Sequence, residues 1–300
     1  GVAIAISVGG PGAVFWMWVT AIIGVTTKFY TASLAVMYRG RDSSGVLRGG
    51  PMYVISEGLG KRWYPLAVLF AVAGALGTLP LFQTNQLVSL LREVVAIPTG
   101  LATESQHMTF DIIAGVVLAI LALIVVLGRI ERIGKLTVRL VPSMLLLYIG
   151  MTLIVLIRYW QNIPEVFMLI VNDAFSGTSV AGGALGSVIM IGVRRGAFSN
   201  EAGIGTESMA HGEAKTSEPI REGVVAMTGP IIDTLIVCSC TAFMILLTGV
   251  WQTGGDMEGV ALTVAALEKV FPHSGIYLLL LMVALLSFST IVTFWFYGSK

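Results

Sequence analysis

A glycine-rich stretch inside an apolar run is the first feature of this sequence that could do chemistry. Residues 174–193 read AFSGTSVAGGALGSVIMIGV and contain five glycines and four hydroxyl residues. A glycine weakens a helix by roughly 1 kcal/mol relative to alanine, and irregular backbone is tolerated at membrane depth only where protein or a cavity covers it. We therefore predict a helix interrupted at Gly182–Gly186, where free backbone groups face a small ligand. The alternative is an unbroken helix in which Gly182 and Gly186 form a close helix–helix contact.

Polar side chains also interrupt three other apolar runs. Gln83 and Asn85 carry both donors and acceptors and either face a ligand or hold helices together. Ser289 and Thr290 offer the oxygen ligands that a hard cation such as sodium prefers, or they bond to carbonyls of their own helix. Asp233 is a functional candidate because a carboxylate inside a span is costly. Pairing of Asp233 with basic groups or a neighbouring hydroxyl is an equal alternative.

The elements that must position these residues are membrane helices. Of the 300 residues, 56% are hydrophobic and 12% are charged, whereas soluble domains carry about 25% charged residues. A bilayer core needs about 20 apolar residues per helix, so the sequence predicts an all-α integral membrane protein. Residues 1–9 are expected to be the remainder of one more span, in a fragment that lacks both ends. The predicted spans are 12–37, 64–91, 109–127, 138–157, 174–198, 222–248 and 274–298.

Lysine and arginine residues predict the orientation of these spans. Their numbers in successive connections alternate as 5, 1, 4, 1, 4, 1 and 1, and the basic connections of membrane proteins lie in the cytoplasm. We therefore expect a multi-pass protein of the inner (plasma) membrane with its basic loops cytoplasmic. Residues 162–175 are expected to form a helix on the outer surface, and 254–272 an outer lid or a simple connector.

The function classes that the sequence disfavours are also clear. It shows no nucleophile–base pair, histidine metal cluster or phosphate-binding motif, so we expect no enzyme. An ion channel is a weaker alternative to a carrier. We expect no nucleic-acid partner and a monomeric protein in the lipid bilayer.

Several motifs together resemble a known family. The chain is similar to the alanine/glycine:cation symporters along nearly its whole length, and the combination of SNEAG with GGPGAVFWMW is specific. The resemblance implies a LeuT-type inverted-repeat fold with broken core helices 1 and 6. Residues 1–158 would be the first repeat, from the end of core helix 1 through helix 5, and 159–300 the start of the second, core helices 6 to 8. The similar segments are GVAIAISVGGPGAVFWMWVTAIIGVTTKF, RGGPMYVI, RIERIGKLTVRLVPSMLLLY, RRGAFSNEAGIGTESMAHGEAKT, IIDTLIVCSCTAFMILLTG and FST.

The resemblance also implies sodium-coupled symport of small neutral amino acids, alanine or glycine, by alternating access. The substrate carboxylate would meet the backbone N–H groups of Gly1, Val2 and Ala3 at the edge of the first break. The ammonium would meet the carbonyls of Gly182 and Gly183. Gln83 would be a substrate-facing amide, with Asn85 as a weaker candidate.

The coupling ion, Na⁺, would be held by Ser289 and Thr290 on helix 8. Glu201 would close an inward gate through an ion pair with Arg194, Arg195 or Arg39, unless it is a solvated loop acid. The sequence departs from the family pattern at three positions of interest. Thr293 replaces a glycine, Phe294 replaces a tryptophan that covers the substrate, and Thr31 replaces an acidic residue. The departures at Thr293 and Phe294 leave open a proton-coupled carrier of another small solute.

Overall fold

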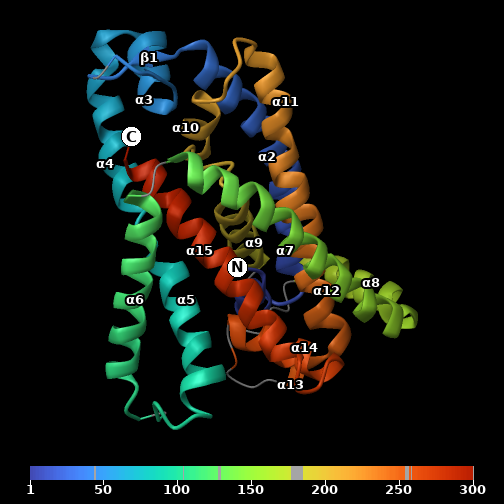
Figure 1. Cartoon of the computed structure of the whole chain (residues 1–300). Coiled ribbons are helices and arrows are strands. Elements are labelled where there is room, and N and C mark those ends of the chain that lie inside the picture. The colour runs from blue at the N-terminus through green and yellow to red at the C-terminus, as the bar shows by residue number, and fades with distance from the viewer. Residues whose placement is uncertain are drawn as a thin grey trace. The chain divides into compact units, whose positions relative to one another are not determined.

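The computed structural model of the chain is almost entirely helical (Figure 1). It describes residues 1–43, 45–103, 105–127, 130–176, 185–253, 257 and 259–299, with backbone alone at 126–127, 130–140 and 185. Among these residues, six helical stretches are long and apolar enough to cross a membrane, and they coincide with six of the seven predicted spans. The seventh, 174–198, lies partly outside the described residues. The six stretches are 12–37, 61–96, 108–125, 141–158, 219–248 and 275–298.

The chain forms two compact units, each built from segments of both halves of the sequence. Unit 1 comprises residues 1–78, 164–242 and 297–300. Its elements are α1 (Val2–Gly9), α2 (Gly12–Met37), β1 (Gly40–Arg41), β2 (Leu47–Arg48), α3 (Pro51–Tyr53), the short helical turns Val54–Leu59 and Lys61–Trp63, α4 (Tyr64–Gly77), α8 (Ile163–Ser176), α9 (Leu185–Asn200), α10 (Glu207–Gly212), α11 (Pro219–Pro230), a π-helical segment η5 (Ile231–Cys238) and the start of α12 (Ser239–Thr248).

Unit 2 comprises residues 79–163 and 243–296. Its elements are α5 (Leu81–Leu91), a π-helical turn (Arg92–Ala96), α6 (Met108–Leu127), α7 (Ile130–Arg158), a 3₁₀ turn (Trp160–Asn162), the rest of α12, α13 (Val250–Thr253), α14 (Val260–Val270) and most of α15 (Gly275–Gly298).

Helix α2 is the centre of unit 1, because α9, α10 and α11 all pack on it (Figure 1). The contacts use small residues. A Cβ at Gly192 would lie 2.5 Å from the Ala13 carbonyl oxygen, and one at Gly196 would lie 3.0 Å from Thr20. Small residues let helix backbones approach closely in a membrane. A close glycine contact is therefore present at Gly192 and Gly196, a G-x-x-x-G pair that follows Gly182 and Gly186 in the sequence.

The GGPG turn before α2 is fixed by the acidic end of α8. Gly10 has φ +76°, a left-handed conformation that favours glycine. The Gly12 N–H donates to Asp173 Oδ2 at 2.7 Å, and Trp16 Nε1 donates to the Ala174 carbonyl at 3.1 Å. A carboxylate at a helix N-terminus satisfies an otherwise free N–H and complements the helix dipole.

The predicted span 64–91 is divided into two helices, which differs from the single span expected from its apolar length. Helix α4 ends at Gly77 and α5 begins at Leu81, with Thr78, Leu79 and Pro80 between them. Proline has no N–H to donate and disfavours a helical conformation in the preceding residue. By contrast, Pro230 lies inside a continuous helical stretch, which continues as the π-helical segment η5 and then α12. Such π-helical segments often mark functional positions.

Arg39 fastens the segment after α10 to the end of α2. Its guanidinium donates to the carbonyls of Gly212, Ala214 and Thr216, each at 2.6 Å. The β1–β2 hairpin lies beside this clamp and pairs Gly40 with Arg48, and Arg48 forms ion pairs with Asp42 and Glu213.

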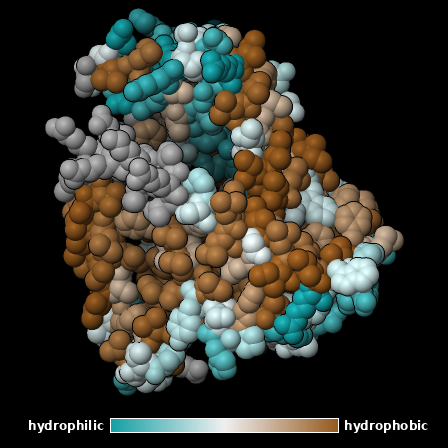
Figure 2. Space-filling model, turned by 45° about the vertical axis from the view of Figure 1, so that its right-hand side comes forward, coloured by the Kyte–Doolittle hydropathy of each residue, from teal (hydrophilic) through white to brown (hydrophobic). Residues whose placement is uncertain are grey.

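The surface of the chain is suited to lipid. Hydrophobic side chains cover broad stretches of the face in Figure 2, and hydrophilic ones gather at the end that carries β1 and α3. No residue in the apolar part of α6, residues 108–125, is buried. The other helices of unit 2 therefore leave most of α6 exposed. The predicted outer helix at 162–175 corresponds to α8, which buries Val166, Ile170 and Ala174 along one side.

Changing Gly212 to alanine should destabilise unit 1. A Cβ at Gly212 would lie 2.5 Å from Gly49 Cα and 2.7 Å from its carbonyl carbon, and backbone cannot move aside as a flexible side chain can. We expect Gly212→Ala to lower the free energy of unfolding by about 1–3 kcal/mol, as overpacking does. Thermal unfolding of the full-length protein in detergent measures this loss.

Gly150→Ala is the matched control, because nothing lies within 4 Å of a Cβ at that position of α7. It should leave the melting temperature unchanged or raise it. Equal melting temperatures for the two variants would show that the Gly49–Gly212 contact has no structural role.

Candidate functional site

Gly1, Val2 and Ala3, the residues proposed to meet the substrate carboxylate, lie at the start of α1. The Ala5 N–H is bonded to the Gly1 carbonyl at 3.0 Å. Val2 and Ala3 are buried, whereas Gly1 is exposed. Helix α1 packs against both α2 and α9. The role of these positions toward the substrate carboxylate stays a prediction.

The second predicted element of the site, Gly182 and Gly183, lies outside the described residues. Helix α8 ends at Ser176 and α9 begins at Leu185. The interruption of the helix at these glycines therefore stays a prediction. Helix α1 lies beside α9, since a Cβ at Gly9 would lie 3.1 Å from Ile191.

The two amides of α5 lie on different faces of the helix. Gln83 is half-buried and shares its face with Leu87 and Leu90, which are 2% and 0% exposed. Asn85 is exposed and shares its face with Ser89 and Arg92, one and two turns further along. The two amides therefore cannot hold one small ligand from the same side.

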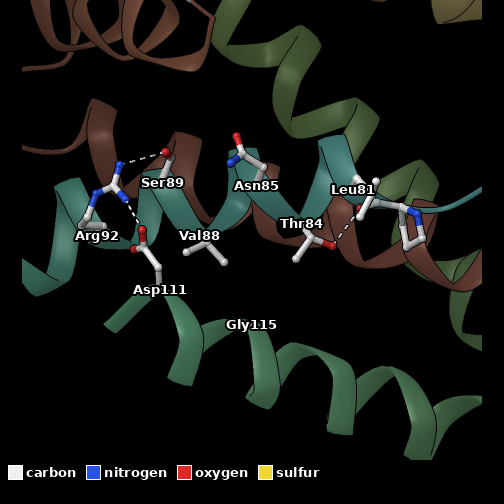
Figure 3. A pocket seen from close by; sticks show the side chains of 9 residues that line it. Leu81, Thr84, Asn85, Val88, Ser89, Arg92, Asp111 and Gly115 are labelled. Atoms are coloured by element: carbon white, nitrogen blue, oxygen red, sulfur yellow. Dashed lines mark hydrogen bonds and ion pairs between the residues drawn. The ribbon is translucent and has the colours of Figure 1, made fainter. Parts of the chain in front are cut away.

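Asn85 lines a cavity of about 320 Å³ between α5 and α6, which lies wholly in unit 2 (Figure 3). Arg92 closes one end of it, donating to Asp111 Oδ2 at 2.5 Å and to Ser89 Oγ at 3.1 Å. His107 Nδ1 lies 2.9 Å from the same carboxylate oxygen. The remaining lining residues are Pro80, Leu81, Thr84, Val88 and Gly115.

Ser289 and Thr290 lie in the middle of α15 and share one acceptor. Each hydroxyl donates to the Leu286 carbonyl at 2.9 Å, which is the local bonding that serine and threonine often show in helices. A hydroxyl that donates its hydrogen in this way keeps its lone pairs for a cation. The oxygens are therefore chemically fit for Na⁺, although the bonding also matches a purely structural role. Phe294 follows one turn later on the same helix and is half-buried.

A group of buried and half-buried polar residues lies on the elements that pack against α2 in unit 1. Ser199 Oγ donates to Asp233 Oδ2 at 2.6 Å, which agrees with the expectation that a hydroxyl partners this carboxylate. Thr206 Oγ1 donates to Glu201 Oε2 at 3.2 Å. In these contacts a hydroxyl supplies the hydrogen bond that a buried carboxylate requires.

Glu201 differs from our prediction in its partners. Arg39 is committed to three carbonyls, and neither Arg194 nor Arg195 forms an ion pair with Glu201 among the described residues. Glu201 itself has φ +57° at the end of α9. Burial raises the pKa of its carboxyl above the ordinary value, Lys28 opposes this shift and Glu207 adds to it. Its role in a gate stays a prediction, now without an arginine partner.

Sequence reasoning missed Lys28 and Glu207. Lys28 is only 8% exposed in the middle of the apolar helix α2, and Glu207 is 5% exposed at the start of α10. Thr31, which stands where the resembled family has an acid, donates to Glu207 Oε1 at 3.1 Å. The signal for Lys28 was present in the sequence, because an ionisable residue inside a predicted span is a functional candidate by default.

Comparison with known proteins identifies the family. The whole chain, residues 1–300, matches the sodium:alanine symporter family. It is 38% identical to the "Probable sodium/glutamine symporter GlnT" of Bacillus subtilis, over 99% of this chain and 60% of that protein. It is 37% identical to the "Sodium/alanine symporter AgcS" of Methanococcus maripaludis, over 100% of this chain and 65% of that protein. For the "Amino-acid carrier protein AlsT" of B. subtilis the identity is 36%, over 99% and 61%. The chain thus spans between 60% and 65% of the length of these relatives.

The raised pKa of Glu201 predicts a pH-dependent stability. A carboxyl whose pKa is raised in the folded state stabilises that state below its unfolded value, ordinarily 4.5, and this contribution is lost as the pH rises through the folded value. Glu201→Gln removes the titration, so the melting temperature of the variant minus that of the wild type should increase with pH above 4.5.

Thermal unfolding in detergent at a series of pH values measures this difference. Glu218→Gln is the control, because Glu218 is an exposed carboxylate of the same region. A difference for Glu201→Gln that is constant with pH would refute the assignment.

Proposed function

This chain belongs to the sodium:alanine symporter family, and we propose that the protein containing it carries out sodium-coupled symport of small neutral amino acids by alternating access. The family and the relatives are carriers, so the protein is a transporter rather than an enzyme. Alanine and glycine are the proposed substrates. The chain spans only part of its relatives, and one of them is named for glutamine.

The observation that carries the proposal is the packing of α1 and α2 against α9 and α11. The first helices of the two predicted repeats, far apart in sequence, thereby form one unit (Figure 1). This arrangement supports a LeuT-type plan with repeats 1–158 and 159–300, in which core helices 1 and 6 are broken. Transporters of that kind bind substrate and ion at the unwound parts of such helices.

The proposed substrate site is built mainly from backbone. A zwitterion needs a partner for both charges, since an unpaired buried charge is very costly. The backbone N–H groups of Gly1, Val2 and Ala3 would hold the carboxylate, and the carbonyls of Gly182 and Gly183 the ammonium. Of the α5 amides, Gln83 is the one that we propose faces substrate. Asn85, on the opposite face, would line the α5–α6 cavity instead.

The proposed sodium site uses Ser289 and Thr290. Their free lone pairs support the proposal, as do the sodium-coupled names of the relatives. Phe294, one turn away, would cover the substrate, and Glu201 would act at the inward gate. We propose that the basic loops face the cytoplasm and that the protein is monomeric in the inner membrane.

A proton-coupled carrier of another small solute is the second candidate. The buried carboxylates near Lys28 favour it, because such groups can bind and release a proton. Uptake of labelled alanine and glycine by the full-length protein in liposomes, with sodium and pH gradients imposed separately, tests both candidates. Uptake driven by pH alone would favour the second.

Removing the hydroxyl of Thr290 should weaken the response to sodium. If this oxygen ligates the ion, Thr290→Ala raises the sodium concentration for half-maximal uptake by about tenfold, and Ser289→Ala has a smaller effect. Thr293→Ala is the matched control, since Thr293 also donates to a carbonyl of α15 one turn earlier. Wild-type sodium dependence in both test variants would place the ion elsewhere.

Adding a methyl group at Gly183 should change substrate preference. If the backbone there approaches the ligand, Gly183→Ala reduces alanine transport more than glycine transport, because the larger ligand loses its space first. One methylene of fit corresponds to about 1–3 kcal/mol, so the ratio of the two transport efficiencies should fall by about tenfold. An unchanged ratio with less folded protein would instead indicate a packing glycine.

A further inference from the structure

One side of α2 carries a row of contacts with buried polar groups. Gly24, Lys28 and Thr31 lie at successive turns of one face. A Cβ at Gly24 would lie 3.4 Å from Asn200 Nδ2, and Thr31 donates to Glu207. Lys28 lies between these two contacts along the helix. All of these residues belong to unit 1.

Two buried polar atoms in this row, Glu207 Oε2 and Asn200 Nδ2, lack a hydrogen-bond partner. Glu207 is 5% exposed, and its Oε2 atom has no hydrogen-bond donor, while Oε1 has only Thr31. Lys28 is 8% exposed, and its ammonium forms no hydrogen bond or ion pair with any residue that the structure describes. Its Nζ instead lies 3.4 Å from the position of a Cβ on Gly229 of α11. Buried charged groups are ordinarily paired.

The charges around Lys28 do not balance. Lys28 acts electrostatically on both Glu201 and Asp233, and Glu207 acts on Glu201. With all four groups ionised, the described residues of this cluster carry a formal net charge of −2. A net charge of this kind in a medium of low dielectric constant strongly favours the entry of a cation.

We infer that Glu207 and Glu201 form a binding site for one monovalent cation, a proton or Na⁺, separate from the hydroxyl pair on α15. The cation would occupy the side of Glu207 where Oε2 has no donor. Thr31 and Thr206 hold the two carboxylates from the other side through their hydroxyl donors. The inference rests on the proposed transport function in one respect. In that function, this site would take up or release a coupling cation at the basic, cytoplasmic side.

Lys28 sets the affinity of this site. Its ammonium is a fixed positive charge near the carboxylates but in contact with none of them, so it repels the incoming cation and limits how tightly the cation binds. The other groups facing Glu207 and Glu201 are Asp233 of η5 and the buried phenol of Tyr297 at the end of α15. The removal of Lys28 and the removal of Glu207 must therefore change cation affinity in opposite directions.

Cation-dependent thermal stability of the purified full-length protein tests the inference without a substrate, because a ligand that binds only the folded state raises its melting temperature. The melting temperature is measured against NaCl, with choline chloride keeping the ionic strength constant, and against pH without sodium. We expect Glu207→Gln to raise the half-saturating cation concentration by about tenfold and Lys28→Met to lower it by about tenfold. The titration that responds identifies the cation as Na⁺ or the proton.

Three controls make the outcome decisive. Glu218→Gln removes an exposed carboxylate and should leave both titrations unchanged. Lys28→Arg keeps the charge and should behave as wild type, and Glu201→Gln supplies a second acidic variant if Glu207→Gln does not fold. The inference is overturned if the Lys28→Met and Glu207→Gln shifts have the same sign or are absent. It is also overturned if Thr290→Ala alone abolishes the response. If the wild-type protein does not carry alanine or glycine, the proposed function is rejected. The melting-temperature titrations would still test the cation site.

Discussion

Close packing of α9 and α11 on α2 holds unit 1 together, and the positions of its polar groups follow from that packing. Helices in a membrane gain little from hydrophobic burial, because lipid tails are as apolar as leucine, so close contact between backbones must hold them together. Glycine makes this contact possible at Gly192 and Gly196 of α9 and at Gly223 of α11, where a Cβ would lie 2.9 Å from Phe29 of α2. Helices from both halves of the sequence therefore pack around α2 in one unit.

The same packing determines where the charged side chains lie. Because α9 ends against α2, the SNEA segment and α10 place Glu201 and Glu207 beside Lys28 and Thr31. In a packed apolar interior, hydroxyl groups of Ser199, Thr206 and Thr31 supply the donors for carboxylates. Among the described residues, the ammonium of Lys28 forms no hydrogen bond or ion pair, and Glu207 Oε2 has no donor. An ionisable group in such a position is costly to retain, and function is the usual reason for it.

Membership of the sodium:alanine symporter family gives these features a common interpretation. A symporter needs a site for a zwitterion, a site for a cation and groups that respond when either leaves. In the proposed function, the first residues of α1 would serve the zwitterion and the hydroxyl pair of α15 the cation. The carboxylates near Lys28 would bind a cation at a separate site. Each unit contains residues of both predicted repeats, so neither repeat would form its unit alone.

Residue order alone was enough to establish the class of protein and most of its membrane helices, but the contacts between residues required the folded chain. Span length and apolar composition are local properties, and six predicted spans agree with helical stretches of the structure, one of which is divided near Pro80. The motifs led to the family for the same reason. Local signals for the break at Pro80 and for the intramembrane Lys28 are also present in the sequence, although the predictions above made no use of them.

By contrast, folding separates Gln83 from Asn85 by placing one on the packed face of α5 and the other on the cavity side. In the folded chain, the Arg39 guanidinium donates to three carbonyls and not to Glu201. Thr31 of α2 donates a hydrogen bond to Glu207 of α10. A hydrophobic pattern fixes which residues lie in the bilayer, but the rotation of each helix about its axis is set by the neighbours that pack against it.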